Sequence, residues 1–316
     1  MYKYANRLTV VDKGQRIRPL KYNVVSNYKI GVPVQNVSPI IHKPNHKPIE
    51  RKSKSNILGH QEFVNTPINY NKHRIIKNEY QSRSAVDIGK LKNSGKGKIL
   101  VIIAPGPSVL EVDVSKLNGA KNVDVMTINK PDIRVWPTKY WTFCDNSQYL
   151  RNKEAFDSYD GILFNSGSVR VNHKNQVMLK SLHASRGFSL DLTEGVYIGR
   201  STTYFAMQVA LWLNYDKIYI YGCDMCKAEI NVNGKKSNLL HSYGVNPDVP
   251  EDVRIKRFAH EAEFYDYAAD FLSKELKGKF YFCSKYNNWP FVRKYNKIDH
   301  VGSIDIVINE AKGLGR

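Results

Sequence analysis

The first candidate for chemistry in this sequence is a tight loop that follows an apolar run. Residues 99–104 are apolar and partly β-branched without alternation, which is typical of a parallel strand buried on both faces. Pro105, Gly106 and Pro107 end that run, and Ser108 adds a hydroxyl. Gly106 lacks a Cβ, so it would let backbone N–H groups approach a ligand closely. Because open α/β sheets bind nucleotides at the carboxyl ends of their strands, the pattern predicts a phosphate-binding loop, with an ordinary strand-to-helix turn as the alternative.

Other residues could act at such a site. Arg200 follows a second Gly-containing turn and could pair with phosphate, although a surface arginine is equally consistent with the pattern. His241 lies in a polar stretch and is a candidate substrate contact, where a surface role is the more common one. Cys223 and Cys226 have the spacing of a redox pair, but they follow a late strand, so neither thiol chemistry nor a zinc site is predicted.

These residues must be positioned by a sheet, because strand-like and helical patterns alternate from residue 97 onward. Phe205, Val209 and Leu213 recur at helical spacing and predict a helix over 201–213, and a second apolar stripe predicts one over 258–276. The alternation predicts a Rossmann-like α/β fold, a mostly parallel sheet with helices on both faces. The predicted strands are 98–104, 123–128, 140–144, 161–165, 217–222 and 279–283.

The composition divides the chain into three parts. Residues 1–94 are rich in basic residues and prolines and predict an extended, weakly structured N-terminal arm. Residues 95–290 hold the predicted Rossmann-like domain, and 291–316 are expected to form a C-terminal tail. Inside the domain, residues 226–257 show little periodicity, which is typical of a functional lid or an insert; we call them the lid segment.

The charge balance restricts the partners. The 316 residues carry a formal net charge of +19, and more than half of that excess lies in residues 1–92. Such an excess favours an anionic partner, and tyrosines interleaved with basic residues in the arm suit single-stranded nucleic acid. An arm that wraps its own domain, a neighbouring subunit or a larger assembly is the plainer alternative. The oligomeric state is not predicted.

The composition also bears on location. No apolar run nears 20 residues and the N-terminus does not resemble a signal peptide, so we expect a cytoplasmic protein without a membrane span. Four cysteines in a chain of this length do not make a disulfide framework. If the source is a virus such as a phage, the expected compartment is the host cytoplasm.

Several motifs occur in an order that resembles one superfamily. Gly-Pro-Ser at 106–108 ends the first strand, and Asn129 follows the second. A Ser/Thr-rich helix start at 201–203, a strand closing in Gly-x-Asp at 222–224, and His260 in the last long helix complete the pattern. Over residues 97–290 the chain is similar to the bacterial sialyltransferases of the Campylobacter lipooligosaccharide type and to the MptE-like family, named for an archaeal 6-hydroxymethylpterin pyrophosphokinase.

The resemblance to the sialyltransferases implies glycosyl transfer from a nucleotide-sugar donor to a hydroxyl acceptor. It implies that His260 is the general base, since a neutral imidazole can accept a hydroxyl proton at cellular pH. It implies no tightly bound cofactor and no metal. The donor-binding residues that it implies are Gly106, Pro107, Ser108, Asn129, Asp145, Asn146, Ser201, Thr202 and Asp224, with Arg200 and His241 as further phosphate or lid contacts.

The sequence departs from the sialyltransferase pattern in ways that leave alternatives open. Pro105 stands where those enzymes have an asparagine, which leaves the donor uncertain. The segment 240–244 looks more like the MptE-like branch, which implies a pyrophosphokinase using ATP and magnesium, with Asp145 and Asp224 helping to hold the metal. A third alternative is a nucleic-acid-binding or assembly module that keeps the fold without catalysis. A transferase brought by its arm to DNA with a hydroxylated base would combine these functions.

Overall fold

The computed structural model of the protein describes residues 85–167, 169, 171, 173–182, 186–232, 234–243 and 250–314. Residues 1–84, which make up most of the predicted arm, lie outside the described residues. The nucleic-acid and assembly partners predicted from the arm therefore stay predictions.

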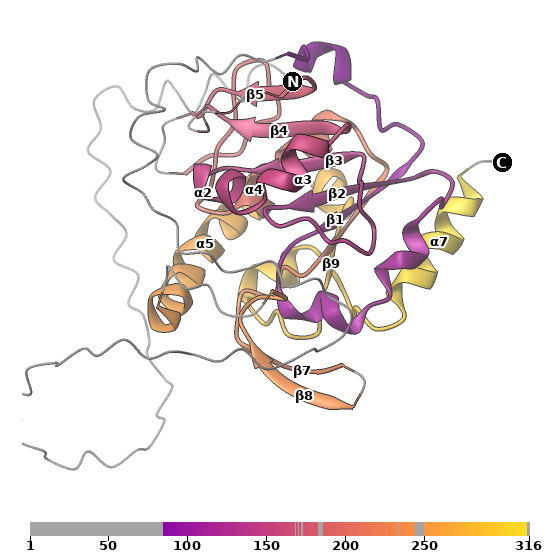
Figure 1. The fold of residues 1–316 in the computed structure, drawn as a ribbon, viewed down its shortest axis with the longest axis vertical. Helices are drawn as coiled ribbons and strands as arrows, with labels where there is room; N and C mark the ends of the chain where they lie inside the picture. The colour runs from indigo at the N-terminus through magenta and orange to yellow at the C-terminus, as the bar shows by residue number, and fades with distance from the viewer. Residues whose placement is uncertain are drawn as a thin grey trace, which may run out of the picture. The chain divides into compact units, whose positions relative to one another are not determined.

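The described residues form a parallel sheet of eight strands in the order β10-β9-β6-β1-β2-β3-β4-β5 (Figure 1). The fold is therefore Rossmann-like α/β, as the alternating pattern predicted. Chain order reverses beside β1, because β2 to β5 follow on one side of it and β6, β9 and β10 on the other. The strands are β1 Ile99–Ile103, β2 Val123–Ile128, β3 Tyr140–Phe143, β4 Ile162–Ser166, β5 Gln176–Leu179, β6 Lys217–Tyr221, β9 Phe280–Cys283 and β10 Asn296–Ile298.

Helices cover both faces of the sheet. Leu100 and Ile102 of β1 pack in one core with α4 and α5, whereas Ile99, Val101 and Ile103 face α7 on the other side. This alternation explains why β1 is apolar without interruption. The helices are α2 Asn146–Arg151, α3 Lys153–Ser158, α4 Thr202–Trp212, α5 Glu251–Phe271, α6 Lys274–Gly278 and α7 Ser303–Gly313; the short 3-10 turns are η2 Ile88–Leu91, η3 Pro107–Glu111, η4 Val114–Leu117 and η5 Pro290–Lys294.

The domain extends beyond the boundaries predicted from composition. Val86, Ile88 and Leu91 pack against the core, so the last residues assigned to the arm belong to the folded domain. The predicted tail contains β10, which pairs in parallel with β9, and α7, whose Val307 is fully buried. The tail prediction is therefore wrong: these residues complete one edge of the sheet and cover one of its faces.

The lid segment contains regular structure that its sequence did not predict. β7 Ala228–Val232 and β8 Lys235–Leu239 form an antiparallel hairpin, drawn in Figure 1 as a ribbon separate from the main sheet. The end of the lid segment is already helical, because α5 begins at Glu251 and not near residue 258. The early start adds about two turns, with Arg254 and Arg257, to the helix.

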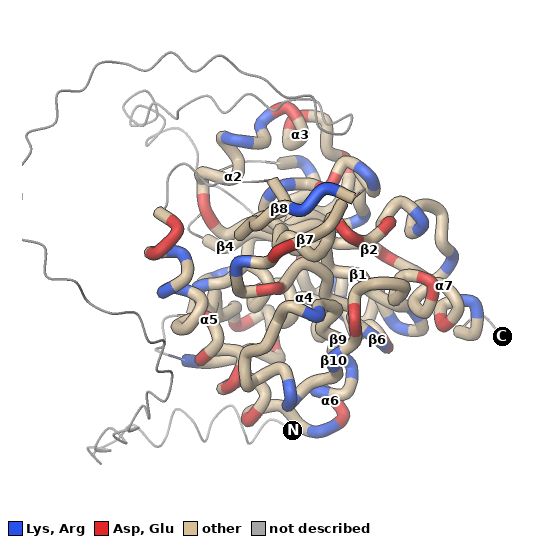
Figure 2. Tube along the Cα trace, turned by 90° about the horizontal axis from the view of Figure 1, so that it is seen from below, with Lys and Arg blue, Asp and Glu red and all other residues tan. Residues whose placement is uncertain are grey.

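The positive excess is not gathered on one described element. Along the described trace, Lys and Arg alternate with Asp and Glu over short distances (Figure 2). Within the part of the chain that the structure describes, no helix has the length and apolar character needed to cross a membrane.

Candidate active site

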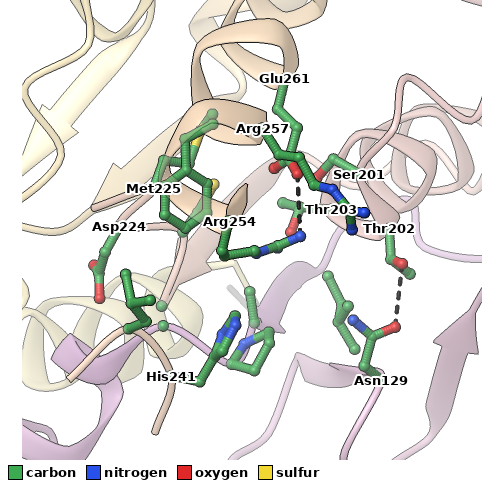
Figure 3. A pocket seen from close by; sticks show the side chains of 18 of the residues that line it. Asn129, Ser201, Thr202, Thr203, Asp224, Met225, His241, Arg254, Arg257 and Glu261 are labelled. Atoms are coloured by element: carbon green, nitrogen blue, oxygen red, sulfur yellow. Dashed lines mark hydrogen bonds and ion pairs between the residues drawn. The ribbon is translucent and has the colours of Figure 1, made fainter. Parts of the chain in front are cut away.

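A polar cavity of about 460 Å³ lies where the chain order of the sheet reverses. Its floor is formed by the residues that follow β1, β2, β3 and β6. Its walls are formed by the start of α4, by His241 and Tyr243 in the middle of the lid segment, and by one face of α5 (Figure 3). Crevices at such a reversal are the usual ligand sites of open α/β sheets. The lining residues used below are Gly106, Asn129, Asp145, Arg151, Arg200, Ser201, Thr202, Thr203, Cys223, Asp224, His241, Tyr243, Arg254, Arg257, Phe258 and Glu261.

The loop after β1 does not offer its backbone N–H groups to a ligand, which corrects the prediction of a phosphate-binding loop. The N–H of Gly106 donates to the carbonyl of Gly222 at 2.7 Å, and the N–H of Ser108 donates to Asp224 Oδ2 at 2.8 Å. Pro105 and Pro107 have no N–H. Gly106 is required for packing instead, because a Cβ there would lie 2.2 Å from the Gly222 oxygen.

Asp224 joins three loops at the carboxyl ends of β1, β6 and β9. Its Oδ1 accepts hydrogen bonds from the Ser108 hydroxyl at 2.6 Å and the Ser284 hydroxyl at 2.5 Å, while Oδ2 accepts the Ser108 N–H. Asp224 and Ser108 are buried, and Ser108 and Pro107 are not among the residues that line the cavity. Pro107 and Ser108, which the resemblance implied as donor contacts, therefore lie beneath the floor of the cavity and do not line it.

Asn129 and the start of α4 form one wall, as the motif order suggested. Asn129 has a left-handed backbone with φ of 60°, and its Oδ1 accepts a hydrogen bond from the Thr202 hydroxyl at 3.1 Å. Within the described residues, Nδ2 of Asn129 has no hydrogen-bond partner. Ser201 does not cap α4, because its hydroxyl pairs with Tyr265 at 2.9 Å. The first N–H groups of α4 are therefore without a side-chain cap and available to an anion.

Asp145 and Asn146, the predicted donor contacts that follow β3, have separate roles. Asp145 lines the cavity and caps α2, accepting hydrogen bonds from the N–H of Gln148 at 3.2 Å and from the Ser147 hydroxyl. Asn146 is the first residue of α2 and is not among the cavity-lining residues. Asp145 and Asp224 are the two carboxylates implied for magnesium, and in the described residues no group of three or more His, Cys, Asp and Glu could hold a metal ion.

One face of α5 brings charge to the cavity. Arg254, Arg257, Phe258 and Glu261 occur at i, i+3, i+4 and i+7, which places them on the same side of a helix. Arg254 Nη1 lies 3.4 Å from Glu261 Oε1, and the guanidinium lies 5.0 Å from the Phe258 ring centre. Figure 3 shows both guanidinium groups directed toward the side where Ser201 and Thr202 lie. Among the described residues, the buried Nε of Arg254 has no hydrogen-bond partner.

Two buried groups in the cavity have strongly shifted pKa values. Burial raises the pKa of the Glu261 carboxyl from 4.5 to about 7, against the opposing effect of Arg254, Arg257 and Arg200. Burial also lowers the pKa of the His241 imidazole to about 4, helped by the nearby charge of Arg254. At neutral pH the cavity therefore holds a neutral imidazole and a carboxyl group near its titration midpoint.

His260 does not line the cavity, which corrects the prediction that it acts there as the general base. Its side chain is 63% exposed, and its Nδ1 lies 3.9 Å from Glu263 on the outer surface of α5. Glu261, the next residue, is rotated from His260 by about 100° around the helix axis and lines the cavity. The histidine in the cavity is His241, which is buried and stacked on Tyr243 with ring centres 4.9 Å apart.

The residues that sequence reasoning missed are Arg254, Arg257 and Glu261. Their i, i+3, i+7 spacing was visible, but the irregular sequence of the lid segment concealed the start of α5. Arg200, which was predicted as a phosphate contact, does line the cavity, with a left-handed backbone at φ of 57°. The site thus combines cationic side chains, an uncapped helix start and one buried carboxyl.

Comparison with known proteins adds no assignment: a scan against protein-family models and a search of curated proteins found no match.

Proposed function

We propose that the protein is a transferase that binds a nucleotide-activated donor through the phosphate groups of that donor. The observation that carries the proposal is the convergence of Arg200, Arg254 and Arg257 with the uncapped start of α4 on one cavity at the sheet reversal. Guanidinium groups bind phosphate through paired, charge-assisted hydrogen bonds. A helix N-terminus adds N–H donors and a favourable dipole.

The leading form of the proposal is glycosyl transfer to a hydroxyl. It is supported by the sialyltransferase-like order of motifs and by the position of Asn129, Ser201 and Thr202 at the donor wall. In such a reaction negative charge develops on the phosphate that leaves, and preorganised cations can stabilise that charge. The stacked rings of His241 and Tyr243 supply a flat surface beside the arginines that suits a base or sugar ring.

The second candidate is pyrophosphate transfer from ATP. It is favoured by the presence in the cavity of His241 and Tyr243, from the segment that resembles the MptE-like branch. The carboxylates implied for magnesium fit that ion poorly. Asp224 is buried and already accepts three hydrogen bonds from Ser108 and Ser284, which use three of the roughly four acceptor sites of a carboxylate.

Thermal denaturation with a panel of ligands tests the proposal. The panel contains nucleoside monophosphates, nucleotide sugars activated by cytidine and uridine phosphates, and ATP with and without magnesium. A ligand that binds the folded form raises the melting temperature. We expect stabilisation by at least one nucleotide sugar; stabilisation by magnesium-ATP alone would select the pyrophosphokinase, and no shift with any nucleotide would refute nucleotide binding.

The arm and its partners stay separate predictions. Deletion of residues 1–84 should leave the nucleotide shift intact if the cavity alone binds the donor. If the arm supplies nucleic-acid binding, the same deletion abolishes association with single-stranded DNA and RNA, and that association in the full chain weakens steeply with salt.

A further inference from the structure

Glu261 is a buried carboxyl that faces the cavity without the full set of partners that a structural carboxylate has. Its side chain is 5% exposed, and Arg254 at 3.4 Å is the ion pair that it makes within the described residues. No hydrogen bond joins it to the loops or helices around it in that part of the chain. By contrast, Asp224 accepts three hydrogen bonds in the same cavity.

The groups that face Glu261 come from three elements. Arg254 and Arg257 of α5 and Arg200 before α4 favour its ionised form. Cys223, which follows β6, and Tyr265 of α5 also interact with it electrostatically, and burial keeps both of these groups protonated at neutral pH. Glu261 is thus the carboxyl in this set whose charge changes near pH 7.

The other candidate bases in the cavity are poorly suited to accept a proton. Asp224 and Asp145 are engaged as hydrogen-bond acceptors from the surrounding loops and α2. His241 is buried and has a pKa of about 4, so its imidazole is a weak base. The Cys223 thiol is kept protonated by burial, which raises its pKa. A base matched to neutral pH is the most effective one for general base catalysis.

We propose that Glu261 is the general base of the transferase, accepting the proton of the acceptor hydroxyl. The proposal depends on the proposed function above. As the acceptor oxygen forms its bond to the transferred sugar carbon, the bond from that carbon to the donor phosphate breaks. The bonding electron pair leaves with the phosphate oxygen beside the arginines, and the acceptor proton moves to a Glu261 carboxylate oxygen. Water can replace the acceptor, which gives slow hydrolysis of the donor.

The test compares turnover in the wild-type protein and in four variants of the full chain. The substrate is the nucleotide sugar that stabilises the wild-type protein in the panel, and the readout is release of the nucleoside phosphate between pH 5.5 and 8.5. In Glu261→Gln we expect kcat to fall by about 100-fold to 10,000-fold, the usual contribution of general base catalysis. The wild-type rate should rise with pH and level off above about 7, and the Gln variant should lose that rise.

The controls are two positions on the outer side of the same helix. Glu263→Gln removes an exposed carboxyl two residues away, and His260→Gln removes the histidine that the sequence pattern suggested. Both should keep wild-type turnover and pH profile. Glu261→Asp, which keeps the acid but shortens it, should retain the pH-dependent rise at a reduced rate. Melting temperature and the nucleotide shift are measured for every variant, to show that each one folds and binds donor.

Each other outcome overturns the inference in a distinguishable way. Full turnover in Glu261→Gln would remove the carboxyl from the reaction while leaving nucleotide binding intact. A loss confined to KM, with the pH-dependent rise retained, would assign Glu261 to positioning Arg254. If no nucleotide stabilises even the wild-type protein, the proposed function fails first and the inference fails with it.

Discussion

The buried carboxyl of Glu261 makes a prediction about stability that needs no substrate. Its pKa is about 7 in the folded protein and 4.5 in the ordinary exposed state, so the folded protein binds a proton more tightly than the unfolded chain does. The stabilisation from this group is complete below pH 4.5 and is lost as pH rises through about 7. The difference between these two pKa values corresponds to about 3 kcal/mol in the free energy of unfolding, at 1.36 kcal/mol for each tenfold change in proton affinity.

The assay is chemical denaturation of wild type and Glu261→Gln at pH 5, 6, 7 and 8. Other titrating groups are shared by the two proteins, so they cancel in the difference between the two free energies of unfolding. Between pH 5 and pH 8 we expect the free energy of unfolding of the variant to rise by about 2.5 kcal/mol relative to that of the wild type, because part of the full effect lies below pH 5. Glu263→Gln, whose carboxyl is 51% exposed, should show no such gain. A difference that stays flat across this range would refute the burial argument.

Three further substitutions test the framework beneath the cavity, each by chemical denaturation. Asp224→Asn should cost about 2–4 kcal/mol, because a buried acceptor of three hydrogen bonds becomes partly a donor, whereas the exposed Asp305→Asn should change stability little. Gly106→Ala should cost about 3 kcal/mol or more, because the new Cβ would meet the Gly222 oxygen, and Gly278→Ala, with open space around it, should be tolerated. Asn129→Ala should be less stable than Asn129→Gly by about 1 kcal/mol, because alanine is strained in the left-handed conformation; equal stabilities would contradict that explanation.

Most of the sheet was predictable because its strands are short apolar runs that can be recognised from local sequence alone. β2 matches its predicted range, and the other five predicted strands differ by a residue at one or both ends. Two of the eight strands, β5 and β10, and the helix α7 were not predicted. β10 is three residues long, and α7 follows it in a stretch that was assigned to a tail. β10 is an edge strand beside β9, and the burial of α7 depends on β1, which lies far earlier in the sequence.

The site was only partly predictable, because two of its features depend on contacts between distant residues. The N–H groups of the first loop are used by Gly222 and Asp224, more than 100 residues later. Nothing in the loop itself indicates that its donors are occupied. The choice between His260 and Glu261 depends on helix phase, and a pattern of polar residues at the start of α5 does not reveal which side faces the sheet. The donor wall at Asn129 and Thr202 was found because its residues follow predicted elements directly.

The most direct test of the central claim is calorimetric titration of pyrophosphate into wild type, Arg257→Ala and Lys256→Ala. Arg257 lines the cavity, while Lys256, its neighbour on α5, has a side chain 79% exposed and paired with Asp252. Loss of a charge-assisted hydrogen bond of about 1.5–3 kcal/mol predicts about 10-fold to 150-fold weaker binding in Arg257→Ala and wild-type affinity in Lys256→Ala. Equal weakening in both variants, or no binding to the wild-type protein, would contradict an anion site in this cavity.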